Sequence, residues 1–285
     1  MIRFAPLLAA LLLSACASAQ PMADDRAHWN APFAPFTVFA NVHYVGPAGV
    51  SSFLITTPEG HILLDGGLPE SAPVIEANIK ALGYDIDDVR ILLNTHAHFD
   101  HAGGLAALKA ASGAALYVSQ ADRAAVESGH VLIGPSAGID FPPAHVDRVI
   151  ADGETIRLGG ATLTAHLTPG HTPGCTSYSM TATNAAGAAH SIFFHCSSSV
   201  AGQSLAPEAY PGVVADYRAA FAKVAAMQAD IFLANHGSFF DLEAKRARQL
   251  SGDADAFVDP GELQRFNTLM QQRFEADLAR ESAVR

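Results

Sequence analysis

Four side chains that can bind a divalent metal lie within the six residues from His96 to His101. The segment reads Asn94-Thr95-His96-Ala97-His98-Phe99-Asp100-His101, and imidazole and carboxylate groups together suit zinc. In an extended turn alternate residues face one side, so His96, His98 and Asp100 would converge while His101 would face the other way. The spacing favours two adjacent metal sites rather than one. The alternative is a His-rich surface turn without a metal, because short motifs also occur by chance.

A rigid strand-to-helix turn would position these side chains. The apolar run Val89 to Leu93 before them predicts a buried strand, and the run Leu105 to Ala111 after them predicts a helix. Four donors are too few for two catalytic zinc ions, since each usually has three protein ligands and an open position for water. Other parts of the chain must therefore supply the missing ligands.

Two further histidines follow strand-like runs in the second half of the chain. His171 lies in the turn Thr168-Pro169-Gly170-His171-Thr172-Pro173-Gly174, and His236 follows the apolar run Ile231 to Leu233. His171 could instead be an ordinary turn histidine. Turns at strand ends can also meet along one edge of a sandwich, so the three turns could build one site. Among the other histidines only His195 lies close to this predicted site, and we interpret the rest as surface or core residues.

The order of the predicted elements indicates two similar halves, packed sheet against sheet with helices outside. Strands are predicted at Phe36–Val45, Ser51–Thr56, His61–Leu64, Val89–Leu93, Ala115–Val118, Val146–Ile150, Glu154–Leu158, Ala161–Leu167 and Ile231–Leu233. Helices are predicted at Ser71–Leu82, Leu105–Ala111 and about Gln120–Glu127. Residues 20–34 are polar and contain several prolines, which predicts a mobile arm, and the Gly- and Pro-rich residues 129–145 predict a long loop.

Length, composition and charge limit the class of protein. A chain of 285 residues with 49% hydrophobic content can bury a full core in one large domain or two small ones. The formal charge is −11, from 17 basic and 28 acidic residues, and the chain has no Lys/Arg cluster for phosphate binding. Nucleic acid is therefore a poor candidate partner.

The first residues have the pattern of an export signal. Arg3 is followed by the short apolar run Phe4 to Leu13 and then by small residues up to Gln20. The run is too short to span a bilayer as a mature helix. Cleavage could occur after Ala19, or before Cys16, because Leu13-Ser14-Ala15-Cys16 resembles a bacterial lipobox whose cysteine carries a lipid anchor.

Cys175 and Cys196 remain after such a signal is removed. An even pair of cysteines in an exported protein can form a disulfide, because the compartment is oxidising. Two cysteines can also be small buried hydrophobic residues. The residues alone leave both alternatives open.

Together these motifs resemble the metallo-β-lactamase superfamily, whose signature His-Xaa-His-Xaa-Asp-His occurs here at residues 96–101. Four further parts of the chain resemble subclass B3 metallo-β-lactamases in particular: Gly46–His61, Gly170–Gly174, His236 with Phe239–Lys245, and Ala256–Pro260. The likeness covers roughly residues 29–280, so it is far more specific than one short motif. It implies a single α/β domain over residues 20–285, a four-layer αβ/βα sandwich in which two packed mixed sheets carry helices on their outer faces.

The resemblance also implies which residues bind metal. A first zinc ion would be held by His96, His98 and His171, and a second by Asp100, His101 and His236. One zinc would polarise the carbonyl of a β-lactam, a hydroxide shared by both ions and oriented by Asp100 would attack it, and the second zinc would stabilise the leaving nitrogen. The implied protein is an exported, periplasmic dizinc hydrolase of β-lactam antibiotics.

A segment between the last two predicted ligands distinguishes subclass B3 from other branches of the superfamily. Thioesterases such as glyoxalase II, lactonases and RNA-processing nucleases have a bridging carboxylate there, whereas residues 192–199 contain no Asp or Glu. By resemblance to subclass B3, Ser197 and Ser199 would bind the substrate carboxylate, and Cys196 would form a disulfide with Cys175. A shift of one residue would instead put Cys196 at a metal-ligand position, as in subclass B1.

Two other functions remain open. A lactonase or thioesterase could use the same ligands on a related carbonyl, and a periplasmic metal-binding protein could keep the ligands without turnover.

Overall fold

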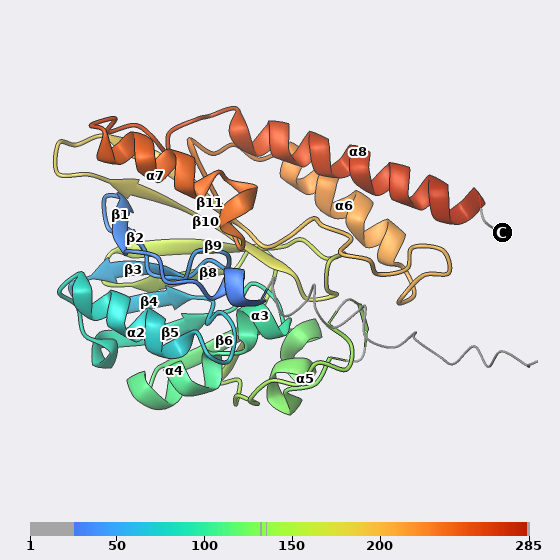
Figure 1. Cartoon of the computed structure of the whole chain (residues 1–285), viewed down its shortest axis with the longest axis horizontal. Helices are drawn as coiled ribbons and strands as arrows, with labels where there is room; N and C mark the ends of the chain where they lie inside the picture. Colours follow the sequence, from blue (N-terminus) through green and yellow to red (C-terminus); the bar gives the residue numbers. More distant parts are fainter. Residues whose placement is uncertain (1–25, 132, 135, 284–285) are drawn as a thin grey trace, which may run out of the picture.

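The computed structural model of the protein describes residues 26–131, 133–134 and 136–283. Within this part of the chain two β-sheets lie face to face, and helices cover the outer face of each sheet (Figure 1). The predicted four-layer αβ/βα sandwich is therefore confirmed. The predicted export signal at residues 1–19, including Cys16 with its possible lipid anchor, lies outside the described residues.

The first sheet has seven strands, which are neighbours in the order in which they occur along the chain. They are β1 (Phe36–Phe39), β2 (Val42–Tyr44), β3 (Phe53–Thr57), β4 (Gly60–Leu64), β5 (Val89–Leu93), β6 (Ala115–Ser119) and β7 (Arg148–Ile150). Strands β1 to β4 pair antiparallel, and β4 to β7 pair parallel. Parallel neighbours need crossover connections, and the helices between β4 and β7 supply them.

The second sheet has five strands in the order β12-β11-β10-β9-β8. They are β8 (Thr155–Leu158), β9 (Ala161–Leu167), β10 (Thr176–Thr183), β11 (Ala189–His195) and β12 (Ile231–Ala234). Strands β8 to β11 pair antiparallel, whereas β11 and β12 are parallel. The carboxyl ends of β5 in one sheet and of β9 and β12 in the other carry the three turns with the predicted ligands.

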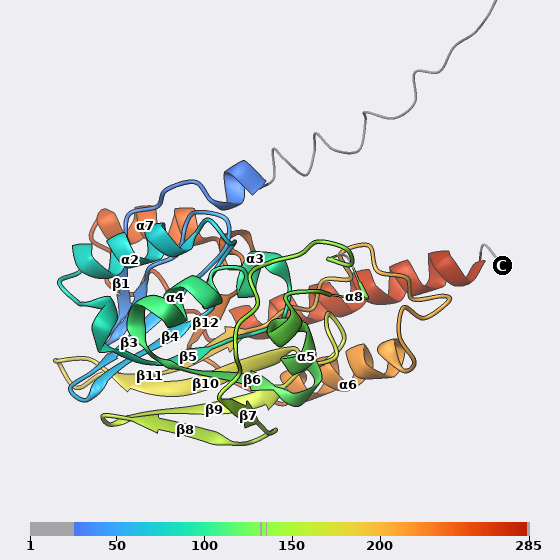
Figure 2. The same cartoon turned by 90° about the horizontal axis from the view of Figure 1, so that it is seen from below.

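The helices of the two outer layers come from different halves of the chain (Figure 1). The first half contributes α2 (Ala72–Ala81), the 3-10 helix η1 (Ile86–Asp88), α3 (Phe99–Ala102), α4 (Leu105–Ser112) and α5 (Gln120–Ser128). The second half contributes α6 (Val213–Ala225), the 3-10 helix η2 (Gly237–Phe239), α7 (Leu242–Leu250) and α8 (Glu262–Ala283). Helices α6 and α8 lie side by side and share an apolar cluster that includes Tyr217 and Phe274 (Figure 2). No helix in the described residues is both long and apolar enough to cross a membrane.

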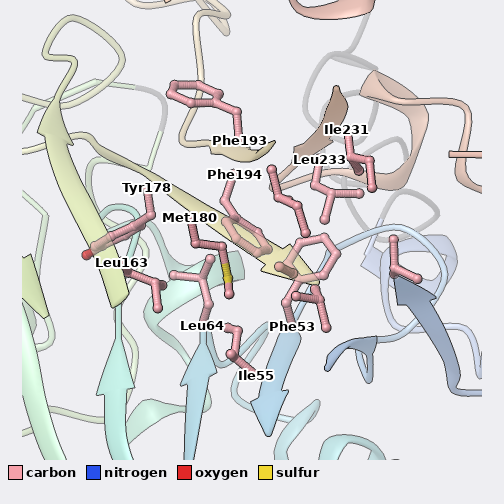
Figure 3. Close-up of a cluster of buried hydrophobic side chains, with 14 of the residues drawn as sticks. Phe53, Ile55, Leu64, Leu163, Tyr178, Met180, Phe193, Phe194, Ile231 and Leu233 are labelled. Atoms are coloured by element: carbon pink, nitrogen blue, oxygen red, sulfur yellow. The ribbon is translucent and has the colours of Figure 1, made fainter. Parts of the chain in front are cut away.

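The main hydrophobic core lies between the two sheets (Figure 3). Alternate residues of one strand face opposite sides, so in β4 the side chains of Ile62 and Leu64 enter this core while Leu63 packs against the helices. Phe53 of β3 meets Phe194 of β11 edge to face, with ring centroids 5.3 Å apart. Both faces of the central strands are thus buried, which explains their nearly continuous apolar sequences.

Two predictions for the N-terminal region are wrong. Residues 36–45 form the hairpin of β1 and β2 rather than one strand, because Ala40 has φ = +49° and the chain reverses there. The described part of the expected mobile arm is packed on the fold: residues 26–29 are helical, and the ring centroid of Trp29 lies 6.3 Å from that of Phe99. These errors have one cause, since neither Ala40 nor Trp29 carries a local signal for the conformation that tertiary contacts select.

Candidate metal centre

The turn after β5 and the turn after β9 bring three histidines together. His96, His98 and His171 are all buried, and each offers a ligand atom within 4.8 Å of the other two. His96 and His98 follow β5 of the first sheet, whereas His171 follows β9 of the second sheet. The three rings meet because the ends of these two strands lie next to each other. The structure thus assembles the first predicted ligand group.

A second group forms beside the first from α3 and the turn after β12. Asp100, His101 and His236 also offer ligand atoms within 4.8 Å of one another. Oδ2 of Asp100 lies 3.2 Å from Nε2 of His101 and 3.4 Å from Nε2 of His236. The ring centroids of His96 and His101 are only 4.4 Å apart, so the two groups are neighbours.

One detail of the turn differs from the spacing argument. Alternation in an extended turn predicted that Asp100 would converge with His96 and His98 while His101 faced away. The structure instead groups Asp100 with His101, because residues Phe99–Ala102 form one helical turn, α3. The two ligand groups match those that the family resemblance implied.

Hydrogen bonds orient the imidazole rings. Nδ1 of His171 donates to the backbone oxygen of Ser199 at 2.7 Å, and Nδ1 of His236 donates to that of Gly49 at 3.1 Å. A carbonyl oxygen accepts only, so in both rings Nδ1 carries the proton and Nε2 keeps its lone pair. Such contacts fix the tautomer and orientation that a metal ligand needs.

Asp65, at the end of β4, supports the ligand turn from below. Its Oδ1 accepts hydrogen bonds from Nδ2 of Asn94 at 3.0 Å and from the backbone N–H of Thr95 at 2.7 Å. The Thr95 hydroxyl donates to Oδ2 at 2.7 Å and so can accept from Nδ1 of His96, which lies 3.1 Å away. Burial raises the pKa of Asp65 to about 6, against the opposing effects of the His101 charge and these hydrogen bonds. The carboxylate thereby fixes the start of the turn and, through Thr95, the ring of His96.

The electrostatics of the first group favour neutral imidazoles. Burial, followed by the neighbouring histidines, lowers the pKa of His96 and of His98 well below the ordinary histidine value. Burial also lowers the pKa of His171 to about 4. Neutral rings keep the lone pairs that a metal cation requires.

The second group is electrostatically different. Burial opposes ionisation of Asp100, but the charge of His101 and the close contacts of the carboxylate with the rings of His101 and His236 outweigh it and hold the pKa of Asp100 well below its usual range. Burial likewise opposes protonation of His101, but the charge of Asp100 and a hydrogen bond to it, together with the charge of Asp65, raise the pKa of His101. An ionised carboxylate in a buried cluster of imidazoles is suited to a divalent cation.

Two ring nitrogens indicate directly that a cation fits. Nε2 of His96 and Nε2 of His98 are both buried without any hydrogen-bond partner among the described residues. Buried polar atoms are almost always satisfied, so two orphans in one ligand group need an explanation. A metal bound by these rings is that explanation, and the fold with its His-rich donor set is typical of zinc.

A cleft with a cavity volume of ≈ 400 Å³ opens onto both ligand groups. The aromatic side chains of Trp29, Phe99 and Phe239 form part of its wall, and Ser136 and Ile139 come from the loop predicted at residues 129–145. A volume of this size falls within the usual range of small-molecule sites. The loop thus borders the cleft that holds the candidate metal ligands.

The two predicted substrate-binding serines differ in position. Ser199 lines the cleft, and its hydroxyl lies 3.4 Å from Nδ1 of His171. Ser197 is buried behind it, with the two hydroxyl oxygens 3.2 Å apart. His195, which lies close to this segment, is also buried, and its Nε2 pairs with the hydroxyl of Ser198 at 2.7 Å. His195 belongs to neither ligand group and supports the serine segment from within.

Cys175 and Cys196 are joined in a disulfide, the pairing that the family resemblance implied. The alternative register, with Cys196 as a metal ligand, is therefore wrong, because its sulfur is already bonded. The bridge ties the turn that carries His171 to the segment that carries Ser197 and Ser199.

Two residues beside this centre were not predicted from the sequence. Trp29 was assigned to a mobile arm, yet its ring centroid lies 5.5 Å from that of His236. Asp122 was assigned only to a helix, yet its carboxylate accepts hydrogen bonds from both turns of the first ligand group. No local pattern in the sequence distinguishes either residue.

The chain has clear relatives among known proteins. A family model described as the metallo-beta-lactamase superfamily matches residues 45–236. BJP-1, a subclass B3 metallo-β-lactamase of Bradyrhizobium japonicum, is 39% identical, with 90% of this chain and 98% of that chain covered and a TM-score of 0.85. A metallo-β-lactamase of Cronobacter sakazakii with a HARLDQ motif is 42% identical, with 90% and 99% covered and a TM-score of 0.86.

Partial similarity extends to another kind of hydrolase. The hydroxyacylglutathione hydrolase of Hyphomonas neptunium is 35% identical over 103 residues, which are 36% of this chain and 32% of that relative. The chain thus spans less than half of the length of these curated relatives, from 30% to 47%. The solved metallo-β-lactamases, in contrast, match over nearly their whole length.

Proposed function

The chain belongs to the metallo-β-lactamase superfamily of hydrolases, and we propose that it is an exported dizinc enzyme that opens the amide bond of β-lactam antibiotics. The observation that carries this proposal is the serine segment after β11. Ser199 lies beside His171 and Ser197 lies behind Ser199, in a stretch without Asp or Glu, where related thioesterases and lactonases would have a bridging carboxylate. The near full-length similarity to subclass B3 enzymes supports the same substrate class.

Six residues would hold the metal ions in the proposed enzyme. His96, His98 and His171 would form the first site, and Asp100, His101 and His236 the second. Bound zinc supplies a Lewis acid for the lactam carbonyl and lowers the pKa of water, so that a nucleophile is available near neutral pH. Three ligands at each site leave a position open for such chemistry.

The residues of the chain would contribute binding and orientation. The ionised carboxylate of Asp100 accepts a hydrogen bond from the attacking water and aims it at the carbonyl carbon. The Ser199 hydroxyl, which lines the cleft, donates to the substrate carboxylate. Trp29, Phe99 and Phe239 pack against the apolar parts of the substrate and exclude water from it. Attack forms a carbon–oxygen bond, the carbon–nitrogen bond of the ring breaks, and the nitrogen takes up a proton.

Two observations support export to the periplasm. Residues 1–19 have the pattern of an export signal. The Cys175–Cys196 disulfide fits an oxidising compartment, because disulfides rarely persist in the cytosol. Immunodetection of the full-length protein in periplasmic and membrane fractions would test the location and the proposed lipid anchor at Cys16 together.

A thioesterase or lactonase is the second candidate, favoured by the partial similarity to hydroxyacylglutathione hydrolases. The deciding experiment compares kcat/KM of the zinc-loaded protein on a penicillin, a cephalosporin, a carbapenem, an acyl-homoserine lactone and a glutathione thioester. We expect the largest value for a lactam. A larger value for the thioester or the lactone would overturn the proposal, and tight zinc binding without turnover of any of them would indicate a non-catalytic metal-binding protein.

A further inference from the structure

Asp122 connects the two turns that supply the first ligand group. It lies in the first turn of α5, outside both ligand groups, and is buried with 3% of its surface exposed. Its Oδ2 accepts from the backbone N–H of Ala97 at 3.0 Å and from the hydroxyl of Thr172 at 2.9 Å. Its Oδ1 accepts from the backbone N–H of Gly174 at 2.9 Å. Ala97 lies between two candidate ligands, and Thr172 directly follows a third.

The local backbone is shaped to admit this carboxylate. A Cβ atom on Gly174 would lie 2.5 Å from Oδ1 of Asp122 and 2.2 Å from the Ser119 hydroxyl, closer than real Cβ contacts. Only glycine therefore allows the turn to approach Asp122. The Ser119 hydroxyl also accepts a hydrogen bond from the backbone N–H of Asp122 at 3.4 Å, which caps α5 and fixes the position of its first turn.

We propose that Asp122 is a positioning residue that holds His96, His98 and His171 at the mutual distances metal binding requires. All three of its partners are donors, so only a group that accepts at both oxygens satisfies them. The inference rests on the proposed metal site but not on its substrate. Buried groups that orient metal ligands typically contribute 10- to 100-fold to metal affinity, as an order-of-magnitude range.

Asp122→Asn is the sharpest perturbation, because it keeps the shape of the side chain. In one orientation of the new amide, its NH₂ group faces the backbone N–H of Gly174. In the other orientation, it faces the backbone N–H of Ala97 and the hydroxyl of Thr172. Two donors therefore meet in either case. Thr172→Val removes one donor and leaves the backbone contacts. Asp230→Asn is the matched control, because Oδ2 of Asp230 also accepts from one backbone N–H and one hydroxyl, both of Ser191, at the start of β12.

The experiment measures zinc dissociation constants by competition with a chromophoric chelator, on the metal-free full-length protein. For Asp122→Asn we expect one of two zinc equivalents to bind about 10- to 100-fold more weakly, and for Thr172→Val a smaller loss at the same equivalent. Asp230→Asn should lower the urea midpoint of the metal-free protein without changing either constant. Spectra of the cobalt-loaded variants should show altered geometry only for Asp122→Asn and Thr172→Val.

Unchanged zinc constants in Asp122→Asn would overturn the proposal, whatever its effect on stability. If that variant does not fold, unchanged constants in Thr172→Val would overturn it. Equal losses of affinity in Asp230→Asn would also contradict it, because the effect would then follow stability alone. A wild-type protein that binds zinc but does not hydrolyse lactams would refute the proposed function and leave this test intact.

Discussion

Removal of the Cys175–Cys196 bridge should destabilise the metal-free protein by a calculable amount. The two cysteines are 21 residues apart in sequence. The loop-entropy relation for a closed loop of this length gives about 3 kcal/mol at 25 °C. Both sulfur atoms are fully buried, so truncation to alanine adds about 1 kcal/mol at each position for lost packing.

A double-mutant cycle separates these two contributions. Cys175→Ala and Cys196→Ala each break the bridge, and each also removes one buried sulfur. The double variant breaks the same bridge only once, so the effects of the single variants are not additive. The coupling energy between the two substitutions should be about 3 kcal/mol, which isolates the bridge from the packing losses.

Urea unfolding of the wild type and the three variants, in excess chelator, provides the free energies. Chelator is needed because bound zinc would stabilise each folded variant according to its own affinity. Additive single substitutions, with a coupling energy near zero, would show that the folded protein contains no bridge. Two freely alkylatable thiols in the native wild type would refute the reasoning independently.

Three further perturbations test the site and the fold. Asp100→Asn removes the only anionic side chain among the six candidate ligands, so kcat should fall on the order of 10²-fold or more and one zinc equivalent should bind more weakly. Near-normal kcat with both metals bound would exclude the role given to Asp100. Ser199→Ala should raise KM more than it lowers kcat, because a substrate-carboxylate contact acts in ground and transition states alike. Ser197→Ala should have a weaker effect on KM, because Ser197 does not line the cleft. Steady-state kinetics with a larger effect of Ser197→Ala than of Ser199→Ala would show that the role given to Ser199 is wrong. Burial lowers the pKa of His43 from 6.5 to about 4, so between these pH values the folded state binds fewer protons than the unfolded state. The free energy of unfolding should therefore fall as the pH drops from 6.5 to about 4. His43→Gln should reduce this pH dependence, and an unchanged slope of the free energy of unfolding against pH would contradict the reasoning.

Much of the fold follows from short-range pattern. Val89 to Leu93 is buried on both faces and was recognisable as a strand, and α2 begins after Ser71 and ends before Gly83, close to the predicted limits. The candidate ligands were also accessible from sequence, because each follows a predicted strand and the resemblance to subclass B3 sorted them into two groups. Local spacing alone did not achieve this, since the helical turn at residues 99–102 places Asp100 and His101 in the same ligand group.

The remainder depends on contacts between distant residues. Asp122 is one more polar residue on an amphipathic helix until Ala97 and Thr172 are placed beside it in space. Trp29 lies in a segment whose polar, proline-rich composition suggested an arm, and only the partner rings of Phe99 and His236 show that it is part of the cleft wall. No signal within a few residues encodes either arrangement.

The central claim is tested most directly by adding zinc back to the metal-free protein and measuring turnover of a β-lactam. The protein is stripped with chelator, titrated with zinc from zero to two equivalents, and assayed at each step for hydrolysis of a carbapenem and a cephalosporin. We expect no hydrolysis without metal and turnover that rises with added zinc, with mass spectrometry showing the ring-opened product as the substrate plus one water. Saturating zinc without any ring-opened lactam, in a protein whose metal content confirms two bound ions, would contradict the account.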